Sequence, residues 1–197
     1  MKLAGKYMYM GIIACTIILI IGCNSNTDNL SYTLPHLPYP IAKERVLITV
    51  AGQGPEGLVV AKVCDDLKIR NVYNYKANVE DLEGRNSLLI VVGVSKTGME
   101  SIHTDFTKEK ERVEKLAAKA AEQRIPLIVL YLGGQNRWDE QSQQLLTKIG
   151  KYANYMIAIS SLEGEEFFRE LASIKNMPYT LVRDLERFNI PLNSVFR

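Results

Sequence analysis

The sequence predicts an α/β fold in which helices cover both faces of a mainly parallel sheet. Short apolar runs of strand length recur along the chain from residue 44 onward. Segments with apolar residues at helical spacing separate these runs, and no internal repeat or low-complexity tract interrupts the alternation. Because strands that alternate with helices join through right-handed crossovers, the pattern predicts a three-layer, flavodoxin-like or Rossmann-like architecture.

The apolar runs are the predicted strands, and most of them are continuously apolar, as buried parallel strands are. The second run is weaker, and the place of the sixth in the sheet stays open. The predicted strands are Val46–Val50, Val72–Tyr75, Leu88–Val92, Leu127–Leu132, Tyr155–Ile159 and the sixth, Tyr179–Val182. We expect the strand order 2-1-3-4-5, which places a ligand crevice beyond the carboxyl ends of strands one and three.

The predicted helices lie between these strands, and each has an apolar stripe at helical spacing. The longest covers Asp105–Gln123 and carries many charged residues on its other face. The apolar positions are Val59, Val60, Val63, Cys64 and Leu67 in the first helix, Phe106, Val113, Leu116, Ala117 and Ala120 in the longest, Leu145, Leu146, Ile149 and Tyr152 in the next, and Phe167, Phe168 and Leu171 in the last.

The first 23 residues have the pattern of a secretion leader. Lys2 and Lys6 precede an apolar run, Met8–Ile21, which is shorter than the roughly 20 residues that span a bilayer. The run closes on Ile-Ile-Gly-Cys, which resembles the bacterial lipobox, because the small Gly22 admits the peptidase and the Cys23 thiol accepts the lipid. An uncleaved anchor helix is the alternative, and both interpretations place the rest of the chain outside the cytoplasm.

Three segments follow from this interpretation. We expect a lipoprotein signal peptide over residues 1–22, a lipidated Cys23 with a flexible tether over residues 23–43, and a single α/β domain over residues 44–197. The tether is rich in Asn, Ser, Thr and Pro, a composition that buries little surface. The predicted location is the extracytoplasmic face of the cell membrane, with acylated Cys23 in the lipid bilayer.

The charge argues against a nucleic-acid-binding domain, and the cysteine content argues against a disulfide-stabilised one. The formal net charge is +2, whereas a nucleic-acid-binding domain needs a strongly basic face. Of the three cysteines, Cys15 lies in the leader and Cys23 at the lipidation position. This leaves Cys64 without a disulfide partner, and its apolar helix face predicts a small core residue.

The segment after the first strand, Gly52–Gly57, matches G-x-G-x-x-G and opens a helix, as the dinucleotide-binding motif does. In that motif, backbone amides at the helix start bind a pyrophosphate. The acidic residue expected about 20 positions later is missing, because Tyr75 and Lys76 stand there. Three interpretations stay open: a nucleotide or flavin site, a tight turn without a ligand, and a site for another anionic or polar group.

Further loops follow strands three, four and five. Gly93–Met99 places hydroxyls beside a lysine, Gly133–Trp138 offers amides and an arginine, and Ser160–Gly164 comes after strand five. Because carboxyl ends of parallel strands meet at one edge, we expect these loops to form one crevice with a positive mouth. The candidate ligand-binding residues are Gly52, Gln53, Gly54, Ser95, Lys96, Thr97, Gly134, Gln135 and Arg137, with Trp138 as a pocket floor or as a staple for the next helix.

Patterns typical of catalysis and metal binding are missing from the sequence. His103 is the one histidine of residues 44–197, and no nucleophile-elbow pattern surrounds a serine. No pair of histidines or cysteines has the spacing of metal ligands. The acidic residues of the longest helix mostly have the spacing of lysine partners, which predicts a solvated face. We therefore expect no cofactor and no metal.

Three segments resemble one bacterial family: LITVAGQG (Leu47–Gly54), VVGVSKTGM (Val91–Met99) and LGGQNRW (Leu132–Trp138). From residue 46 to its end, the chain is similar to the domain-of-unknown-function family number 6305. The resemblance implies a secreted or lipid-anchored α/β domain without an assigned activity, and it carries over no catalytic residue. The family often has serine at the position of Gly54 and prefers an acidic residue at that of Gln135, so this chain departs from the pattern at both.

These observations predict a non-enzymatic, lipid-anchored domain that binds a small polar or anionic solute and passes it to a membrane transporter or sensor. An extracytoplasmic enzyme or nucleotide-binding domain that uses the same crevice is one alternative. An interaction module without a pocket is another. The leading prediction depends on one geometric condition, which is that the loops gather at one edge of the sheet and leave a gap there.

Overall fold

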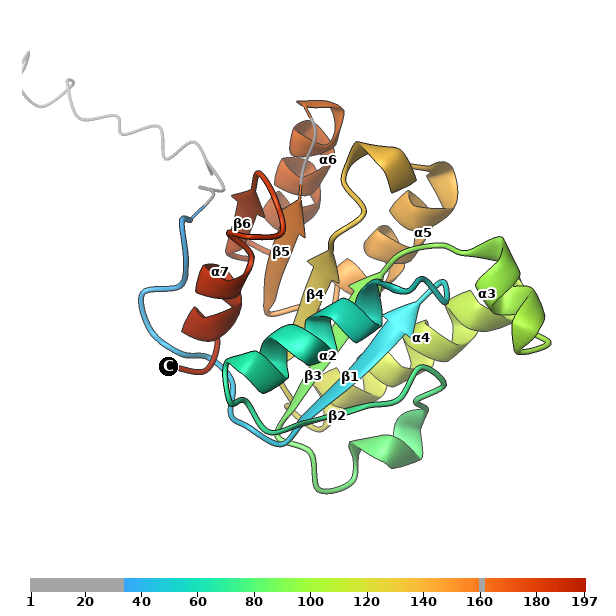
Figure 1. Cartoon of the computed structure of the whole chain (residues 1–197), viewed down its shortest axis with the longest axis horizontal. Coiled ribbons are helices and arrows are strands. Elements are labelled where there is room, and N and C mark those ends of the chain that lie inside the picture. The colour runs from blue at the N-terminus through green and yellow to red at the C-terminus, as the bar shows by residue number, and fades with distance from the viewer. Residues whose placement is uncertain (1–33, 160–161) are drawn as a thin grey trace, which may run out of the picture. The chain divides into compact units, whose positions relative to one another are not determined.

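The computed structural model describes residues 34–159 and 162–197. Its strands are β1 (Val46–Ala51), β2 (Asn71–Tyr73), β3 (Ser87–Val92), β4 (Leu127–Tyr131), β5 (Tyr155–Ile159) and β6 (Tyr179–Val182). They form one parallel sheet in the order β2-β1-β3-β4-β5-β6 (Figure 1). The predicted fold class and the order 2-1-3-4-5 are confirmed, and the sixth strand joins beside β5.

Helices cover both faces of this sheet (Figure 1). The helices are α2 (Glu56–Asp66), α3 (Lys96–Ser101), α4 (Phe106–Glu122), α5 (Glu140–Gly150), α6 (Leu162–Ser173) and α7 (Asn189–Ser194), with short 3₁₀ helices η1 (Val79–Leu82) and η2 (Gln135–Arg137). The first and last of these α-helices, α2 and α7, pack on one face, while α4, α5 and α6 pack on the other. The short α3 follows the carboxyl end of β3, where the sequence predicted a loop.

The sequence pattern explains the two layers of core. Every residue of β1, β3 and β4 is buried, as their continuous apolar runs require. Alternate residues point to opposite faces, so Leu47 packs with the residues of α4 and Ile48 packs with those of α2. Cys64 on α2 is fully buried, which raises the pKa of its thiol to about 12 and confirms that it is a core residue.

The packed domain begins at an earlier residue than the composition predicts. Leu37 and Ala42 are buried, and the N–H groups of Ile41 and Ala42 both donate to the Val195 carbonyl at 3.0 Å. Residues 34–43, expected as the end of a flexible tether, therefore pack against the segment around α7. The composition of this segment is mostly polar and rich in proline, so it does not reveal that Leu37 and Ala42 are buried.

The predicted leader and Cys23 lie outside the described residues, as do residues 160–161 of the expected fourth loop. Over residues 34–159 and 162–197, no helix has the length and apolar character needed to cross a membrane.

Candidate functional site

The loops after β1 and β3 meet at the carboxyl edge of the sheet, as predicted. The N–H of Gly54 donates to the Gly93 carbonyl at 2.8 Å. The N–H of Ser95 donates to the Gly52 carbonyl at 2.7 Å. The two loops are therefore hydrogen-bonded directly to each other. We call these two loops, together with the loop after β4, the rim.

The loop after β4 closes onto the other two through Arg137. Its Nη1 donates to the Val94 carbonyl at 3.1 Å, and its Nε lies 2.7 Å from Oε1 of Glu56, the first residue of α2. The Glu56 side chain is 13% exposed, and its other oxygen, Oε2, is buried without a hydrogen-bond partner among the described residues. The three loops thus form one connected structure at the edge of the sheet.

The Glu56 carboxylate occupies the space that two rim glycines leave open. A Cβ atom at Gly54 would lie 2.2 Å from Glu56 Oε2, and a Cβ atom at Gly93 would lie 2.6 Å from the same oxygen. In a dinucleotide site, such glycines let a phosphate approach the helix start. In this chain a carboxylate of its own lies over these glycines, at the helix end that favours negative charge.

A second carboxylate fills the base of the rim. Glu109 of α4 has a side chain that is only 2% exposed, and its Oε1 accepts hydrogen bonds from Gly52 N–H and Gln53 Nε2, both at 3.0 Å. Arg112 Nη2 donates to the same oxygen at 2.7 Å and to the Val50 carbonyl at 2.6 Å. The amides of Gly52 and Gln53, which were expected to contact a solute, are therefore paired within the chain.

The positive charge that Arg137 was expected to bring to the mouth is neutralised, whereas Lys96 stays exposed beside it. Arg137 is paired with Glu56, and Arg112 is paired with Glu109. The sequence prediction missed Glu109 because it treated the acidic residues of α4 as a solvated face. The signal was its spacing, since position 109 falls on the same helical stripe as Val113 and the other buried residues of α4.

The remaining predicted residues have local structural roles or lie at the surface. Ser95 is the N-cap of α3, and its Oγ accepts a hydrogen bond from Gly98 N–H at 3.0 Å. Lys96, Thr97 and Gln135 are exposed. Of the candidates, Lys96 also lines a separate hollow of about 260 Å³ beside α3 and α4, away from the contacts that close the rim.

Trp138 belongs to an aromatic cluster, and Gly134 accepts a hydrogen bond from a member of that cluster. The Trp138 ring centroid lies 5.5 Å from that of Tyr131 and 5.2 Å from that of Phe167. The Tyr131 hydroxyl donates to the Gly134 carbonyl at 2.7 Å, and burial raises the pKa of this tyrosine, with the negative charge of Asp139 adding to the effect. Trp138, which stands just before α5, therefore packs on aromatic side chains of β4 and α6.

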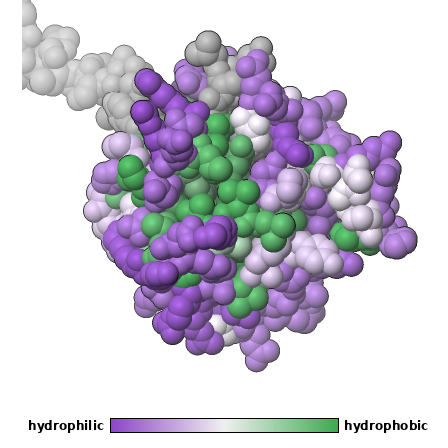
Figure 2. Space-filling view, viewed as in Figure 1, coloured by the Kyte–Doolittle hydropathy of each residue, from purple (hydrophilic) through white to green (hydrophobic). Residues whose placement is uncertain are grey.

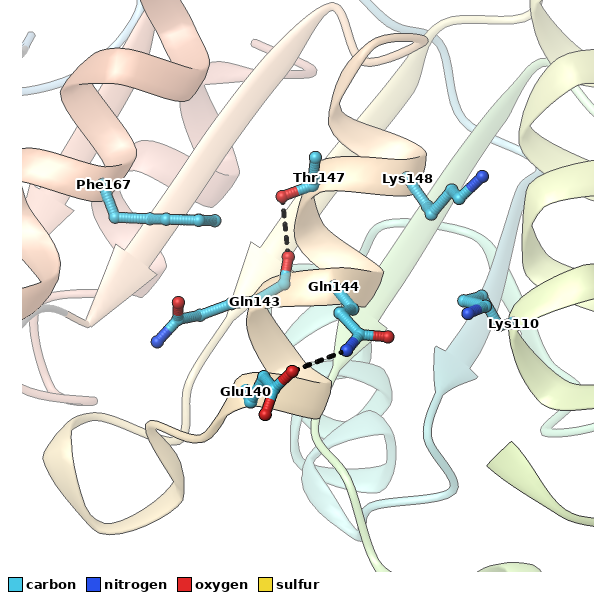
Figure 3. A pocket seen from close by; sticks show the side chains of 7 residues that line it. All are labelled: Lys110, Glu140, Gln143, Gln144, Thr147, Lys148 and Phe167. Carbon is cyan, nitrogen blue, oxygen red and sulfur yellow. Dashed lines mark hydrogen bonds between the residues drawn. The ribbon is translucent and has the colours of Figure 1, made fainter. Parts of the chain in front are cut away.

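The hollow drawn in Figure 3 also lies away from the rim, between α4, α5 and α6. It has a volume of about 320 Å³. Thr147 Oγ donates to the Gln143 carbonyl at 2.8 Å, and Gln144 Nε2 donates to Glu140 Oε1 at 3.1 Å, so these groups are paired within α5 (Figure 3). In the part of the chain that the structure describes, no cluster of three potential metal ligands occurs.

The family of the chain is identified by a family model and not by the geometry of the rim. The model of DUF6305, a domain of unknown function, matches residues 43–196. The chain belongs to the DUF6305 family. The match spans all six strands, and it confirms the resemblance carried by the three rim segments. No curated protein matches the chain. Membership in DUF6305 assigns no activity to the chain.

Proposed function

We propose that this DUF6305 chain is a non-enzymatic, lipid-anchored domain that acts at the extracytoplasmic face of the cell membrane by surface contact with a membrane transporter or sensor. In this proposal it does not enclose a solute in the rim. The observation that carries the closed rim is the position of the Glu56 carboxylate, which fills the space over Gly54 and Gly93.

The pairing of the rim groups supports this proposal. Ligand sites are concave and present polar groups that converge on a vacant space. In the rim the converging groups point at one another, since Glu56 pairs with Arg137 and Glu109 pairs with Gly52 and Gln53. A polar group that is already hydrogen-bonded within the chain gains little by exchanging that bond for one to a solute.

The surface offers a face for contact with another protein. Figure 2 shows hydrophobic residues gathered on the face that carries α2 and α7, with hydrophilic residues around them. The exposed apolar side chains include Leu58 of α2, which is 60% exposed, and Ile190 of α7, which is 58% exposed. Exposed apolar patches with a polar border are typical of protein contact surfaces.

A ligand screen tests the closed rim. The full chain, purified in detergent, would be heated with nucleotides, flavins, carboxylates, phosphates and amines. We expect none of the nucleotides, flavins or carboxylates to bind in the rim, so that any rise in melting temperature is the same in the wild type and in Arg137→Gln. A rise with any of them that the variant Arg137→Gln abolishes would show that the rim admits a solute and would contradict the proposal.

The anchor is tested separately with Cys23→Ser. We expect the wild-type chain to incorporate a radiolabelled fatty acid and to sediment with membranes, and the variant to lose the label. Incorporation of the label by the variant would rule out Cys23 as the lipidation site.

The orphaned oxygen of Glu56 favours a second candidate, which is a small solute that carries an ammonium or another N–H donor. A buried acceptor without a partner costs about 1–3 kcal/mol, so a donor that reached Oε2 would recover this free energy. Such a solute has the opposite charge to the anion expected from the sequence. In the same screen, a melting shift with amines that Glu56→Gln removes would favour this candidate.

A further inference from the structure

We propose that the amino edge of the sheet, opposite the rim, carries a site for a phosphate group. The amino edge is formed by the segments that precede β1, β3 and β4. They enclose a hollow of about 330 Å³ whose polar lining consists of Lys43, Arg85, Asn86 and Arg124. None of these residues belongs to the rim, so the phosphate site does not depend on the closed rim proposed above.

Backbone and side-chain hydrogen bonds hold the three segments together. The Ser87 hydroxyl donates to the Lys43 carbonyl, and Asn86 Nδ2 donates to the Glu44 carbonyl at 2.8 Å. The N–H of Leu88 donates to the Pro126 carbonyl at 2.9 Å. The cationic side chains therefore extend from a preorganised framework at the start of three strands.

The side chains that line this hollow carry a net positive charge. The lining contains three cations and no carboxylate. Within residues 34–159 and 162–197, none of Lys43, Arg85 and Arg124 forms an ion pair, although Arg70 and Arg197 are both paired with the nearby Glu44. A site that concentrates positive charge in a hollow without a counter-ion attracts anions.

Arg85 gives an independent indication of a ligand. Its Nε is buried and, among the described residues, has no hydrogen-bond acceptor. A guanidinium N–H removed from water without an acceptor is unfavourable, because a buried donor loses its hydrogen bonds to solvent. Phosphate oxygens are well matched to a guanidinium that lacks a counter-ion, since this planar group binds phosphate through two parallel hydrogen bonds.

A neighbouring hollow extends the cationic surface along the same edge. It has a volume of about 270 Å³, shares Arg124 with the first hollow, and adds Lys175, Asn154 and Tyr152. Its lining also contains no carboxylate. Arg124 thus stands between the two hollows, where it can contribute to a phosphate bound in either one.

Two sources of a phosphate group fit this chemistry: the headgroup of a membrane lipid and a soluble phosphate ester. The N-terminal segment meets the domain near the same edge, because the Leu34 N–H donates to the carbonyl of Tyr179, the first residue of β6. Only 11 positions separate Leu34 from Cys23 in the sequence. The headgroup source rests on the lipidation of Cys23 proposed above.

The test measures phosphate binding directly. The full chain in a non-ionic detergent would be titrated calorimetrically with inorganic phosphate and with glycerol 3-phosphate, and mixed separately with phosphatidylglycerol vesicles or phosphatidylcholine vesicles in a flotation assay. The test variant is Arg85→Gln with Arg124→Gln. The matched control is Lys62→Gln with Lys115→Gln, which removes the same charge from exposed positions on α2 and α4.

We expect saturable phosphate binding that weakens about tenfold or more in the test variant and is unchanged in the control. Additional binding to phosphatidylglycerol vesicles that the same variant loses would show that the phosphate belongs to a lipid headgroup. Binding to the soluble phosphates alone would show that it belongs to a soluble ester. Because Arg85 is partly buried, the melting temperature is measured for each variant, and Lys43→Gln provides an exposed substitution in the same hollow. Absence of phosphate binding by the wild type, or equal binding by the test and control variants, overturns the proposal.

Discussion

The Glu56 carboxylate lies 2.7 Å from Nε of Arg137, so one ion pair joins the start of α2 to the loop after β4. These residues are 81 positions apart, and the strands that precede them, β1 and β4, are not neighbours in the sheet. The pair spans the place where a doubly wound fold ordinarily receives its ligand. The glycine motif after β1 is thus present in the sequence, but the Glu56 carboxylate occupies the space that a ligand would take.

The contribution of this ion pair is measurable in a double-mutant cycle. We expect Glu56→Gln and Arg137→Gln to show a coupling free energy of about 0.5–1 kcal/mol in urea unfolding, since Arg137 is 36% exposed and solvent screens the pair. The exposed pair Lys62 and Asp66 on α2 is the control, with an expected coupling of about 0.3 kcal/mol. Strictly additive effects at Glu56 and Arg137 would contradict the contact.

The glycines at the rim respond differently to an added methyl group. The nearest atoms to a Cβ at Gly93 belong to Glu56, whereas a Cβ at Gly54 also meets the Gly93 carbonyl oxygen at 2.6 Å. We expect Gly93→Ala to destabilise the wild type by about 1–3 kcal/mol and to be largely tolerated in a Glu56→Ala background. Gly54→Ala stays destabilising in both backgrounds, because backbone cannot move aside. An undiminished cost of Gly93→Ala in the Glu56→Ala background would show that Glu56 is not the obstacle.

Removal of the buried carboxylate beneath the rim is strongly destabilising. Glu109→Gln leaves the Arg112 guanidinium without its counter-ion in a largely buried site, and we expect a loss of about 3–5 kcal/mol from the free energy of unfolding. Glu111→Gln, at an exposed position on the same helix, is the control and should change stability by less than about 0.5 kcal/mol. Similar denaturation midpoints for the two variants would mean that the Glu109 network is not formed.

Tyr155 contributes to the destabilisation of the domain at alkaline pH, as do Cys64 and Tyr131, because burial raises the pKa of all three. Burial raises the pKa of this tyrosine from an ordinary value of 10.0 to about 12, against the opposing effect of its hydrogen bond with Thr180. Because the folded-state pKa is the higher one, the associated stability, ~3 kcal/mol, is fully present below pH 10 and is lost as pH rises toward 12. Tyr155→Phe should flatten the fall in stability over this range. The exposed Tyr39→Phe serves as the control, and an equally steep fall in both variants would refute the assignment.

The six strands and the helices α2, α4, α5 and α6 were predictable because each depends on local pattern, whereas the short α3 and α7 were not predicted. The bounds of β5 and β6 match the predicted runs, and α4 begins directly after Asp105, whose side chain caps the helix. The approach of the three loops followed from parallel topology, since carboxyl ends of parallel strands share one edge.

The contents of the rim could not be predicted in the same way. The pairing of Glu56 with Arg137 and that of Gln53 with Glu109 join residues 81 and 56 positions apart, and no local periodicity encodes such contacts. Ser95 was recognised as a polar loop residue but not as a helix cap, because α3 is short and lacks an apolar stripe of helical length. Residues 34–43 were assigned to the tether because composition alone does not reveal which side chains are buried.

Amide hydrogen exchange tests the closure of the rim most directly. The N–H groups of Gly52, Gly54 and Ser95 donate to Glu109, Gly93 and Gly52 respectively. We expect these three amides, in the full chain without any added ligand, to exchange as slowly as the amides within β1 and β3. Exchange at the rate of exposed loop amides would mean that the rim stands open in solution, which would contradict a rim closed by the chain's own carboxylates.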